Sequence, residues 1–451
     1  MRAIGLIAAS LAWVAASIAY GQAPRVSTEI AKITASDGLY GDGFGASLAA
    51  YGDWVVVGAP GYSTAQYYRA GAVYVFRRSG ARWIEQAQLF AEEQAHQDTF
   101  GFSVAIEADT IVIGAPQMFE AKIGGGVGAA YLFRRFDPAT PNDPSDDLWL
   151  QDAKLTSPDE LRTGDKYGYA VSISQGTVII GRPGWDYSSG SAYLYRRIGN
   201  VWRHWASLNP SDSANLDQFG SAVAISGDTA LIGAYGKSDA GFRSGAAYIF
   251  RQSGDAWVEQ RKLTASDAAA HGFFGVSVGL SSDHAVVGGH GKAYAYPEGV
   301  DHWSEEINLT PNQRGLNFGD DVDANRNWIA VGDPTYGPGF DGLGAVYLFT
   351  RDQIDWELDR QFLASDPTLS AHVGFRLTLQ RNYLFANGRS SVYVFVLPDA
   401  SMSLADFAAF QSCFGGVHSS MSPECTRFDR CGGAGLDPCD LNELLATFVG
   451  P

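Results

Sequence analysis

Short apolar runs separated by glycine and polar turns recur along the chain. In residues 44–59 the segment FGASLAAYGDWVVVGA alternates at first and then becomes almost continuously apolar, and GAVYVF follows after a polar loop. Runs of this length, bounded by glycine and turn residues, are typical of buried strands. Residues 44–76 therefore predict three consecutive strands.

An aromatic–glycine pair opens each unit of this pattern. The pair begins at Phe44, Phe100, Tyr167, Phe219, Phe274 and Phe318, and a degenerate seventh copy begins at Val373. Fourteen residues later the second motif begins, at Gly58, Gly114, Gly181, Gly233, Gly288, Gly332 and, in the degenerate copy, Asn387. A repeat of about 50 residues with several short strands per unit indicates a propeller.

Each unit also predicts a fourth strand that starts at a tryptophan. An apolar residue stands six positions further on, in the pairs Trp83 and Leu89, Trp149 and Leu155, Trp202 and Leu208, Trp257 and Leu263, Trp303 and Leu309, and Trp356 and Phe362. An even spacing places both residues on the same face of a strand. The predicted fold is all-β, a seven-bladed β-propeller of four-stranded blades.

The number of copies predicts how the ring closes. The first three strands occur seven times, but a fourth strand follows only six of these copies. Residues 29–37, EIAKITASD, are similar to the ends of the other fourth strands, as in KLTASD at 262–267. We therefore expect the N-terminal segment to form the outer strand of the last blade, which leaves no blade with an open edge.

The repeated glycines and aromatic residues have a structural explanation. Only small residues let the backbones of neighbouring blades approach near the axis. The aromatic residue of each pair should fill the space between blades, together with the tyrosine of the third strand. These tyrosines are Tyr74, Tyr131, Tyr193, Tyr248, Tyr294, Tyr347 and Tyr393.

The consecutive motifs KLTASD, FGxSVA, VVxGAP and GAxYxF resemble the bacterial FG-GAP repeat, which is related to the propeller of integrin α subunits. The resemblance covers residues 27–395. It implies a seven-bladed propeller that serves extracellular adhesion or recognition, usually without catalysis.

One departure from that family concerns calcium. Calcium-binding members carry an Asp-x-Asp-x-Asp-Gly loop between the first and second strands, whereas this chain has short turns such as Tyr51-Gly52-Asp53 and Ala108-Asp109. Calcium takes six or more oxygen ligands, which such a turn does not supply. Calcium is possible but not expected, and we predict no cofactor.

The candidate binding residues lie in the loops between the second and third strands. These loops and the blade-to-blade connections should emerge on one face, which we call the loop face; the other two kinds of turn form the turn face. The loops vary in length and carry Trp185, Tyr187, Tyr235, Tyr62, Tyr67, Phe119 and Tyr336. Variable, aromatic loops on a rigid scaffold are usual recognition sites. Packing of each ring against neighbouring loops is the alternative.

Two sets of acidic residues repeat on the loop face. The first comprises Asp37, Glu93, Asp159, Asp212, Asp267 and Asp366, with Gln313 in the sixth unit; the second comprises Asp42, Asp98, Asp165 and Asp217. They could attract cations or basic partners. Their repetition favours a role in turns and caps, since aspartate bonds to nearby backbone. A glycosidase-like pair of acids stays open.

Composition and the N-terminal segment bear on partners and location. The formal charge of −17 over 451 residues argues against nucleic acid and anionic membrane surfaces. Residues 1–21, with Arg2 before an apolar run and small residues before Gln22, are typical of a signal peptide. No later stretch reaches membrane-spanning length. We expect an exported protein, secreted, periplasmic or on the cell surface, with its propeller over residues 22–396.

Residues 397–451 predict a separate small module. Ser403 with Asp406 opens one short helix, and Asp440 with Glu443 opens a second. Two short helices that each follow a loop resemble the dockerin-like, EF-hand-related module of secreted planctomycete proteins.

The second loop of this module departs from a calcium-binding EF-hand. Asp429, Asp437 and Asp440 stand at ligand positions one, nine and twelve, but Cys431 and Gly433 occupy positions three and five. Calcium affinity should therefore be poor. The four cysteines, Cys413, Cys425, Cys431 and Cys439, predict two disulfides, and the sequence does not decide their pairing.

Together these features predict a non-catalytic exported protein that binds an extracellular or cell-surface protein or glycan through the loop face. The alternative is a secreted glycan-active lyase or hydrolase that uses acidic residues on the same face, and a third hypothesis is a structural envelope protein. Acids that converge beside the central channel with a raised pKa would favour the enzyme. Exposed aromatic residues on the loops would favour binding.

Overall fold

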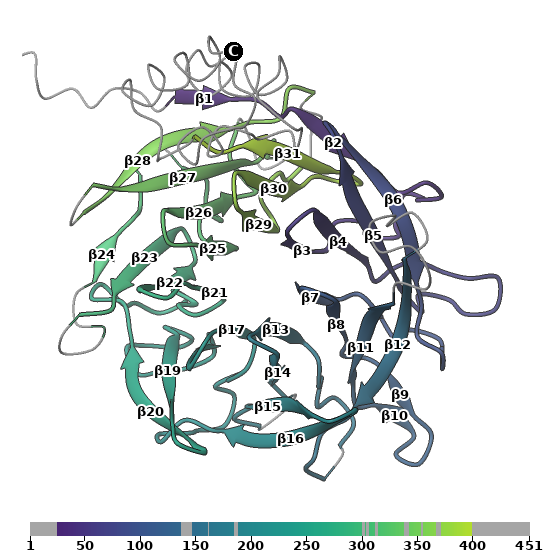
Figure 1. The fold of residues 1–451 in the computed structure, drawn as a ribbon. Helices are drawn as coiled ribbons and strands as arrows, with labels where there is room; N and C mark the ends of the chain where they lie inside the picture. Colours follow the sequence, from purple (N-terminus) through teal and green to yellow (C-terminus); the bar gives the residue numbers. More distant parts are fainter. Residues whose placement is uncertain are drawn as a thin grey trace, which may run out of the picture.

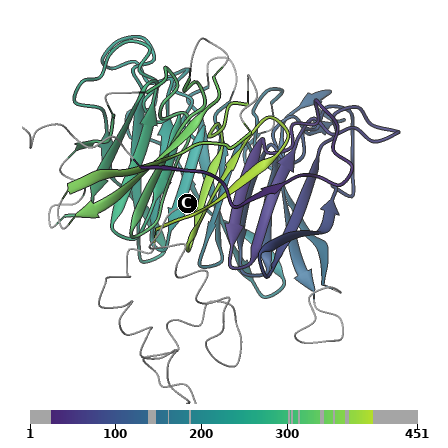
Figure 2. The same cartoon turned by 90° about the horizontal axis from the view of Figure 1, so that it is seen from above.

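The computed structural model describes residues 25–136, 147–160, 162–184, 188–299, 303, 306–311, 314–337, 342–352, 355–366 and 371–398. Their strands form a ring of seven blades around a central channel (Figure 1). Figure 2 shows the ring from the side, with the strands running across its thickness. No helix occurs among the described residues, which confirms the prediction of an all-β, seven-bladed propeller.

In each of the first four blades, the first strand lines the channel and the fourth lies at the rim. Blade one contains β3 (Ser47–Tyr51), β4 (Trp54–Ala59), β5 (Ala72–Ser79) and β6 (Arg82–Leu89). Blade two contains β7 (Ser103–Glu107), β8 (Thr110–Ala115), β11 (Ala129–Phe136) and β12 (Leu148–Leu155). Blade three contains β13 (Ala170–Ser174), β14 (Thr177–Arg182), β15 (Ser191–Ile198) and β16 (Val201–Leu208). Blade four contains β17 (Ala222–Ser226), β18 (Thr229–Ala234), β19 (Ala246–Ser253) and β20 (Ala256–Leu263).

The last three blades depart more from the repeat. Blade five contains β21 (Ser277–Leu280), β22 (His284–Gly289), β23 (Lys292–Pro297) and the short β24 (Ile307–Asn308). Blade six contains β25 (Val322–Ala324), β26 (Trp328–Asp333), β27 (Ala345–Asp352) and β28 (Asp355–Phe362). Blade seven contains β29 (Leu377–Gln380), β30 (Tyr383–Asn387) and β31 (Val392–Val396). In blade two, β9 (Phe119–Glu120) and β10 (Gly125–Gly126) form a hairpin within the loop before β11.

The N-terminal segment closes the ring, as the sequence predicts. Strand β2 (Ala31–Ile33) pairs antiparallel with β31, with Ile33 opposite Val392. The preceding strand β1 (Arg25–Ser27) pairs parallel with β28 and gives blade six a fifth strand. The sequence pattern did not indicate β1. The segment therefore connects the two last blades to the first.

The predicted start of the fourth strand in blade five is wrong. Trp303 lies outside β24, in a bend with a φ of 58°, and its side chain is buried in the core. Pro297 is the last residue of β23 and is equivalent to Arg77 of blade one. In blade one, Arg77 pairs with Ile84 of the fourth strand. Since proline has no N–H to donate to a neighbouring strand, it limits pairing at this point.

The predicted common face of the tryptophan and the apolar residue is also wrong. In blade one the pairing of β5 with β6 shifts so that Gln86 has no partner on β5, and four other blades shift at the equivalent place. This β-bulge adds one residue and inverts the alternation beyond it. Leu89 consequently packs towards blade two, whereas the Trp83 ring lies 5.2 Å from that of Phe385 in blade seven.

The spaces between blades are filled by the aromatic residues that the sequence predicts. In six blades the ring of the aromatic–glycine pair lies 5.3–5.6 Å from the ring of the third-strand tyrosine. The second-motif glycines of blades one to six lie against the next blade. A methyl group on any of them would overlap the carbonyl oxygen of the glycine in the next aromatic–glycine pair. The prediction that close approach requires these glycines is confirmed.

On the turn face, the turns between first and second strands are nearly uniform in length. The turns between first and second strands are residues 52–53, 108–109, 175–176, 227–228, 281–283, 325–327 and 381–382. All have two or three residues, as the sequence predicts, but the turn of blade one is one residue shorter than predicted and that of blade five one residue longer. Among the described residues there is no helix of the length and apolar character needed to cross a membrane.

Candidate functional site

The connections on the loop face differ widely between blades. Residues 60–71 connect the second and third strands of blade one, and residues 235–245 do so in blade four. Blade five has only residues 290–291 at this place, and blade seven only residues 388–391. The loops of the loop face are therefore long over blades one and four and short over blades five and seven.

Two candidate residues of blade one are held by their neighbours. The Tyr62 hydroxyl donates to a carboxylate oxygen of Asp37 at 2.9 Å. The Tyr67 ring lies 5.7 Å from the His96 ring, and both tyrosines are half-buried. These side chains therefore stabilise the loop as well as reaching its surface.

Two further candidates also pack against rings of the same or next blade. Tyr235 lies 6.2 Å from Phe273, and Tyr336 lies 6.2 Å from Tyr347. Burial raises the pKa of the Tyr235 hydroxyl. No ring contact joins any two of these four tyrosines, all of which lie in the described part of the chain. Trp185 and Tyr187 lie outside the described residues.

Large apolar side chains are exposed on the loop face, and most of them are not among the candidate binding residues. Phe119 was a candidate and has 47% of its side-chain surface exposed. The other exposed residues of this kind are Leu39, Tyr40, Tyr68, Ile123, Leu216, Phe242, Leu316 and Phe375. They stand on connections and loops rather than in strands of the ring, so they are available to a partner.

The first set of acidic residues binds the third-strand tyrosines. The tyrosine hydroxyl donates to the aspartate in the pairs Tyr74–Asp37 (2.7 Å), Tyr193–Asp159 (2.6 Å), Tyr248–Asp212 (2.7 Å), Tyr294–Asp267 and Tyr393–Asp366 (2.9 Å). Burial alone would raise the pKa of Asp212. Hydrogen bonds from Lys262 and Tyr248 and the charge of Lys237 outweigh it and lower that pKa to about 2. These acids hold blades together.

The second set caps the connections between blades. Each carboxylate accepts the backbone N–H three residues earlier, from Leu39 to Asp42 (2.8 Å), Ala95 to Asp98 (2.7 Å), Arg162 to Asp165 (2.9 Å) and Ala214 to Asp217 (2.7 Å). This is the turn chemistry that the repetition favours. Neither set forms a free acidic ring.

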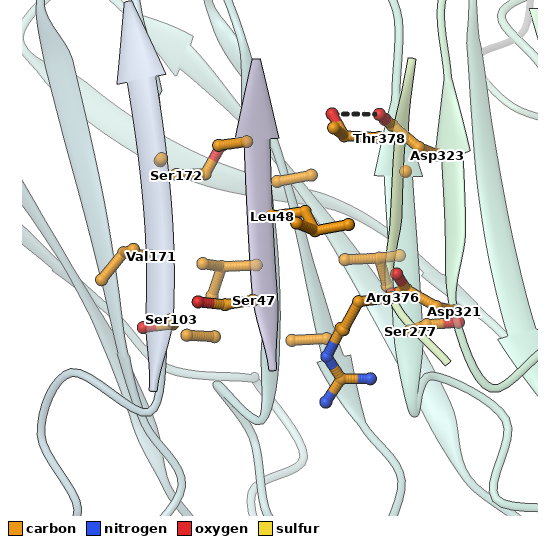
Figure 3. Close-up of a pocket in the computed structure, with 18 of the residues that line it drawn as sticks. Ser47, Leu48, Ser103, Val171, Ser172, Ser277, Asp321, Asp323, Arg376 and Thr378 are labelled. Atoms are coloured by element: carbon orange, nitrogen blue, oxygen red, sulfur yellow. Dashed lines mark hydrogen bonds between the residues drawn. The ribbon is translucent and has the colours of Figure 1, made fainter. Parts of the chain in front are cut away.

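A cavity of about 390 Å³ occupies the central channel and is lined by the first strand of every blade. Blades one to five contribute small or apolar side chains such as Ser47, Ser103 and Val171 (Figure 3). Among the lining residues the charged ones belong to blades six and seven, and they are Asp320, Asp321, Asp323 and Arg376. The sequence-based predictions did not include these residues, although an alignment of the seven copies places Asp321, Asp323 and Arg376 at positions that otherwise hold serine, alanine, glycine or threonine.

The channel aspartates join blade six to blade seven. Asp321 accepts the Leu377 N–H at 2.8 Å. Asp323 accepts the Leu379 N–H at 2.8 Å and the Thr378 hydroxyl at 3.2 Å (Figure 3). Water can reach Asp321 within the channel, yet the carboxyl lies deep among protein atoms. That burial raises its pKa to about 7 against the opposing charge of Arg376.

Replacing Asp321 with asparagine should stabilise the protein more at pH 8 than at pH 5. A carboxyl whose pKa rises from 3.8 to about 7 on folding keeps its proton to a higher pH in the folded state than in the unfolded state. The free energy of unfolding therefore falls as the pH rises from 3.8 to about 7. Asparagine keeps an acceptor for the Leu377 N–H and carries no charge. Since water in the channel screens the carboxyl, we expect a gain of about 1–2 kcal/mol at pH 8.

Thermal melts at pH 5 and pH 8 measure this gain, with Asp255→Asn on the exposed turn 254–255 as the control for loss of one charge. Equal melting shifts for Asp321→Asn at both pH values would show that the carboxyl is not desolvated.

No group of three histidine, cysteine, aspartate or glutamate side chains is placed to hold a metal ion in the part of the chain that the structure describes. The degenerate loop with Asp429, Asp437 and Asp440 and the four cysteines lie outside the described residues.

A ring of repeated four-stranded blades, with loops of variable length on one face, is the architecture of a β-propeller repeat protein. Five segments match the model of the FG-GAP repeat, at residues 27–76, 83–133, 149–195, 202–250 and 257–298. They cover more than half of the chain, which therefore belongs to the FG-GAP repeat family. A search of curated proteins finds no match. The matched segments end within blade five, so the charged channel strands of blades six and seven lie beyond them.

Proposed function

We propose that the protein binds an extracellular or cell-surface protein or glycan through the loop face, without catalysing a reaction on it. The observation that carries this proposal is the set of large apolar side chains exposed on the loop face. Exposed apolar clusters on a soluble protein mark interaction sites, and a few aromatic residues supply most of the affinity of an interface. The FG-GAP propeller fold is compatible with such a role.

The exposed rings stand on loops that are tied to the next blade-to-blade connection. The Tyr68 carbonyl accepts the Gln97 N–H at 2.8 Å, and the Phe242 carbonyl accepts the His271 N–H at 2.8 Å. Asp98 accepts the Phe119 N–H at 3.0 Å. Because these loops are fixed before a partner arrives, less conformational entropy is lost on binding.

A protein and glycan array probed with the full chain tests the proposal. The combined variant Tyr68→Ala, Phe119→Ala and Phe242→Ala should weaken binding of the ligand found there, by about 1 kcal/mol or more for each ring that it contacts. The matched control replaces Tyr51, Ile198 and Val201, which are exposed at or next to turns of the turn face. Loss of binding in the control alone would place the partner on the other face, and an array without any bound ligand would count against the proposal.

We also propose that residues 1–21 direct export and are removed, so that the mature chain begins at Gln22. Support comes from the charged start, apolar run and small residues of the sequence. Mass spectrometry of the N-terminal peptide tests this, and a chain that keeps Met1 after export would refute it. A dockerin-like role for residues 397–451 in attaching the protein to a partner is part of the same proposal.

A glycan-active enzyme is the second candidate function. Asp321 favours it, because a carboxyl with a pKa of about 7 could donate a proton at neutral pH and it lies in a cavity. Its bond to Leu377 gives the same carboxyl a structural role. If the array reveals a glycan that the protein cleaves, Asp321→Asn should abolish cleavage; otherwise the variant should change only the pH dependence of stability.

A further inference from the structure

A pocket of about 530 Å³ opens on the loop face above blade seven. It arises because residues 388–391 form only a short turn, whereas the connection around Tyr40 and the loop after Asp333 border the space on either side. Its lining includes Asn317, Thr335, His372 and Phe375 together with Tyr40 and Arg389. The sequence pattern draws attention to aromatic residues on long loops, whereas this pocket lies over the short loop of blade seven.

Two exposed aromatic rings stand in this pocket, and each is held by an arginine. Tyr40 has 77% of its side-chain surface exposed and Phe375 has 43%. The Arg389 guanidinium lies 4.7 Å from the centre of the Tyr40 ring and donates to its hydroxyl at 2.6 Å. Arg376 lies 4.5 Å from the centre of the Phe375 ring. Cation–π contacts of this kind hold flat rings in place.

The two arginines bring positive charge to blade seven in a chain with a net charge of −17. Some cations on the loop face are paired, such as Lys32 with Asp366 at 2.6 Å and Lys154 with Glu93 at 2.8 Å. Others, such as Arg314, bond only to backbone carbonyls among the described residues. Neither Arg376 nor Arg389 has a carboxylate within ion-pair distance among the described residues. Among the described residues, the Arg389 side chain donates a hydrogen bond only to Tyr40. Other N–H groups of its planar guanidinium therefore remain available to an anion.

Neutral polar groups complete the lining. The Thr335 hydroxyl accepts the Asn317 N–H at 2.9 Å, which fixes both residues. His372 Nδ1 donates to the Pro334 carbonyl at 3.1 Å, so Nε2 of the neutral ring is an acceptor. Flat rings, donors, acceptors and one available cation form a set that matches a sugar ring bearing a negative charge.

We infer that this pocket binds an anionic sugar residue of an acidic glycan, with its carboxylate or sulfate on Arg389 and the apolar face of its ring on Tyr40 or Phe375. This inference rests on the proposed binding role of the loop face and names its ligand class. An acidic peptide fits less well, because acidic peptide motifs are recognised by clusters of arginines and the lining of this pocket contains one arginine, Arg389. Its walls, which are connections and the paired end of β30, also offer no free strand edge to a peptide.

Calorimetric titration of the full chain tests the inference with three sugars: trigalacturonic acid, its methyl ester, which keeps the shape but removes the charge, and a sulfated carrageenan tetrasaccharide. Hexaglutamate is the peptide probe. The wild type should bind the carboxylated or the sulfated sugar at least ten-fold more tightly than the ester. Arg389→Gln should remove this preference. Arg381→Gln, an exposed arginine on the turn face of the same blade, should keep it.

Tighter binding of only one anionic sugar identifies the anion and supports the inference. Equal affinity of wild type and Arg389→Gln for the anionic sugars would overturn it, as would binding of hexaglutamate alone. If a partner from the array depends on Tyr68, Phe119 and Phe242 but no anionic sugar binds, the pocket inference fails and the proposed function stands. If nothing binds the loop face, both fail.

Discussion

Replacing residues 25–36 with a glycine–serine sequence of equal length is expected to unfold or aggregate the propeller well below its normal melting temperature. Ile33 is 97% buried between blades seven and one, and Lys32 pairs with Asp366 at 2.6 Å. Glu29 accepts the Ser365 N–H at 2.8 Å, the same contact that Glu85 makes with Ser36 in blade one. Loss of this segment uncovers the core and the edge of β31, at a cost of about 3–5 kcal/mol or more.

A narrower replacement separates the two N-terminal strands. Glycine–serine substitution of residues 25–27 removes β1 but leaves β2 on blade seven. Blade six keeps its own four strands, so we expect a much smaller shift in a calorimetric melt. A full replacement that melts like the wild type would show that the ring does not depend on this closure.

Replacing Gly233 with alanine is expected to have the second-largest effect. The added methyl group would overlap the Gly275 carbonyl oxygen of blade five, which belongs to the backbone and cannot rotate away as a flexible side chain can. Blades four and five would have to separate along their inner strands, where Leu231 and Ile232 are fully buried. Overpacking of this kind costs about 3 kcal/mol or more, measured by chemical denaturation.

Gly254→Ala is the matched control in the same blade. Gly254 has a φ of +63° on an open turn, and nothing lies within 4 Å of an added methyl group. Its replacement should cost only the backbone strain of about 1 kcal/mol. Similar losses for the two variants would mean that blade spacing is not set by the glycines.

The parts of the fold that repeat were readable from the sequence. Constant spacing places the glycines, the aromatic residues and the closing strand β2, because each blade buries the same positions against its neighbour. The bulge was not readable, since the extra residue is Gln86 in one blade and Trp205 in another and has no common chemistry. The interruption of blade five did have a signal, the proline at position 297.

The candidate site was less predictable because it depends on what does not repeat. The sequence located the variable loops and their aromatic residues, of which Phe119 is well exposed. It did not reveal that Tyr40 meets Phe375 and Arg389, since Tyr40 precedes blade one and the other two residues belong to blade seven, at the opposite end of the ring sequence. Their meeting follows from ring closure and from a short loop, which are properties of the whole fold.

Hydrogen–deuterium exchange of the full chain with its array-identified ligand tests the central claim most directly. If the loop face is the binding surface, the bound ligand should slow exchange in residues 60–71, 116–128 and 235–245 or around residues 388–391. The turns at residues 52–53, 108–109 and 227–228 should exchange as in the free protein. Protection of these turns, with unchanged exchange in the loops, would contradict the account.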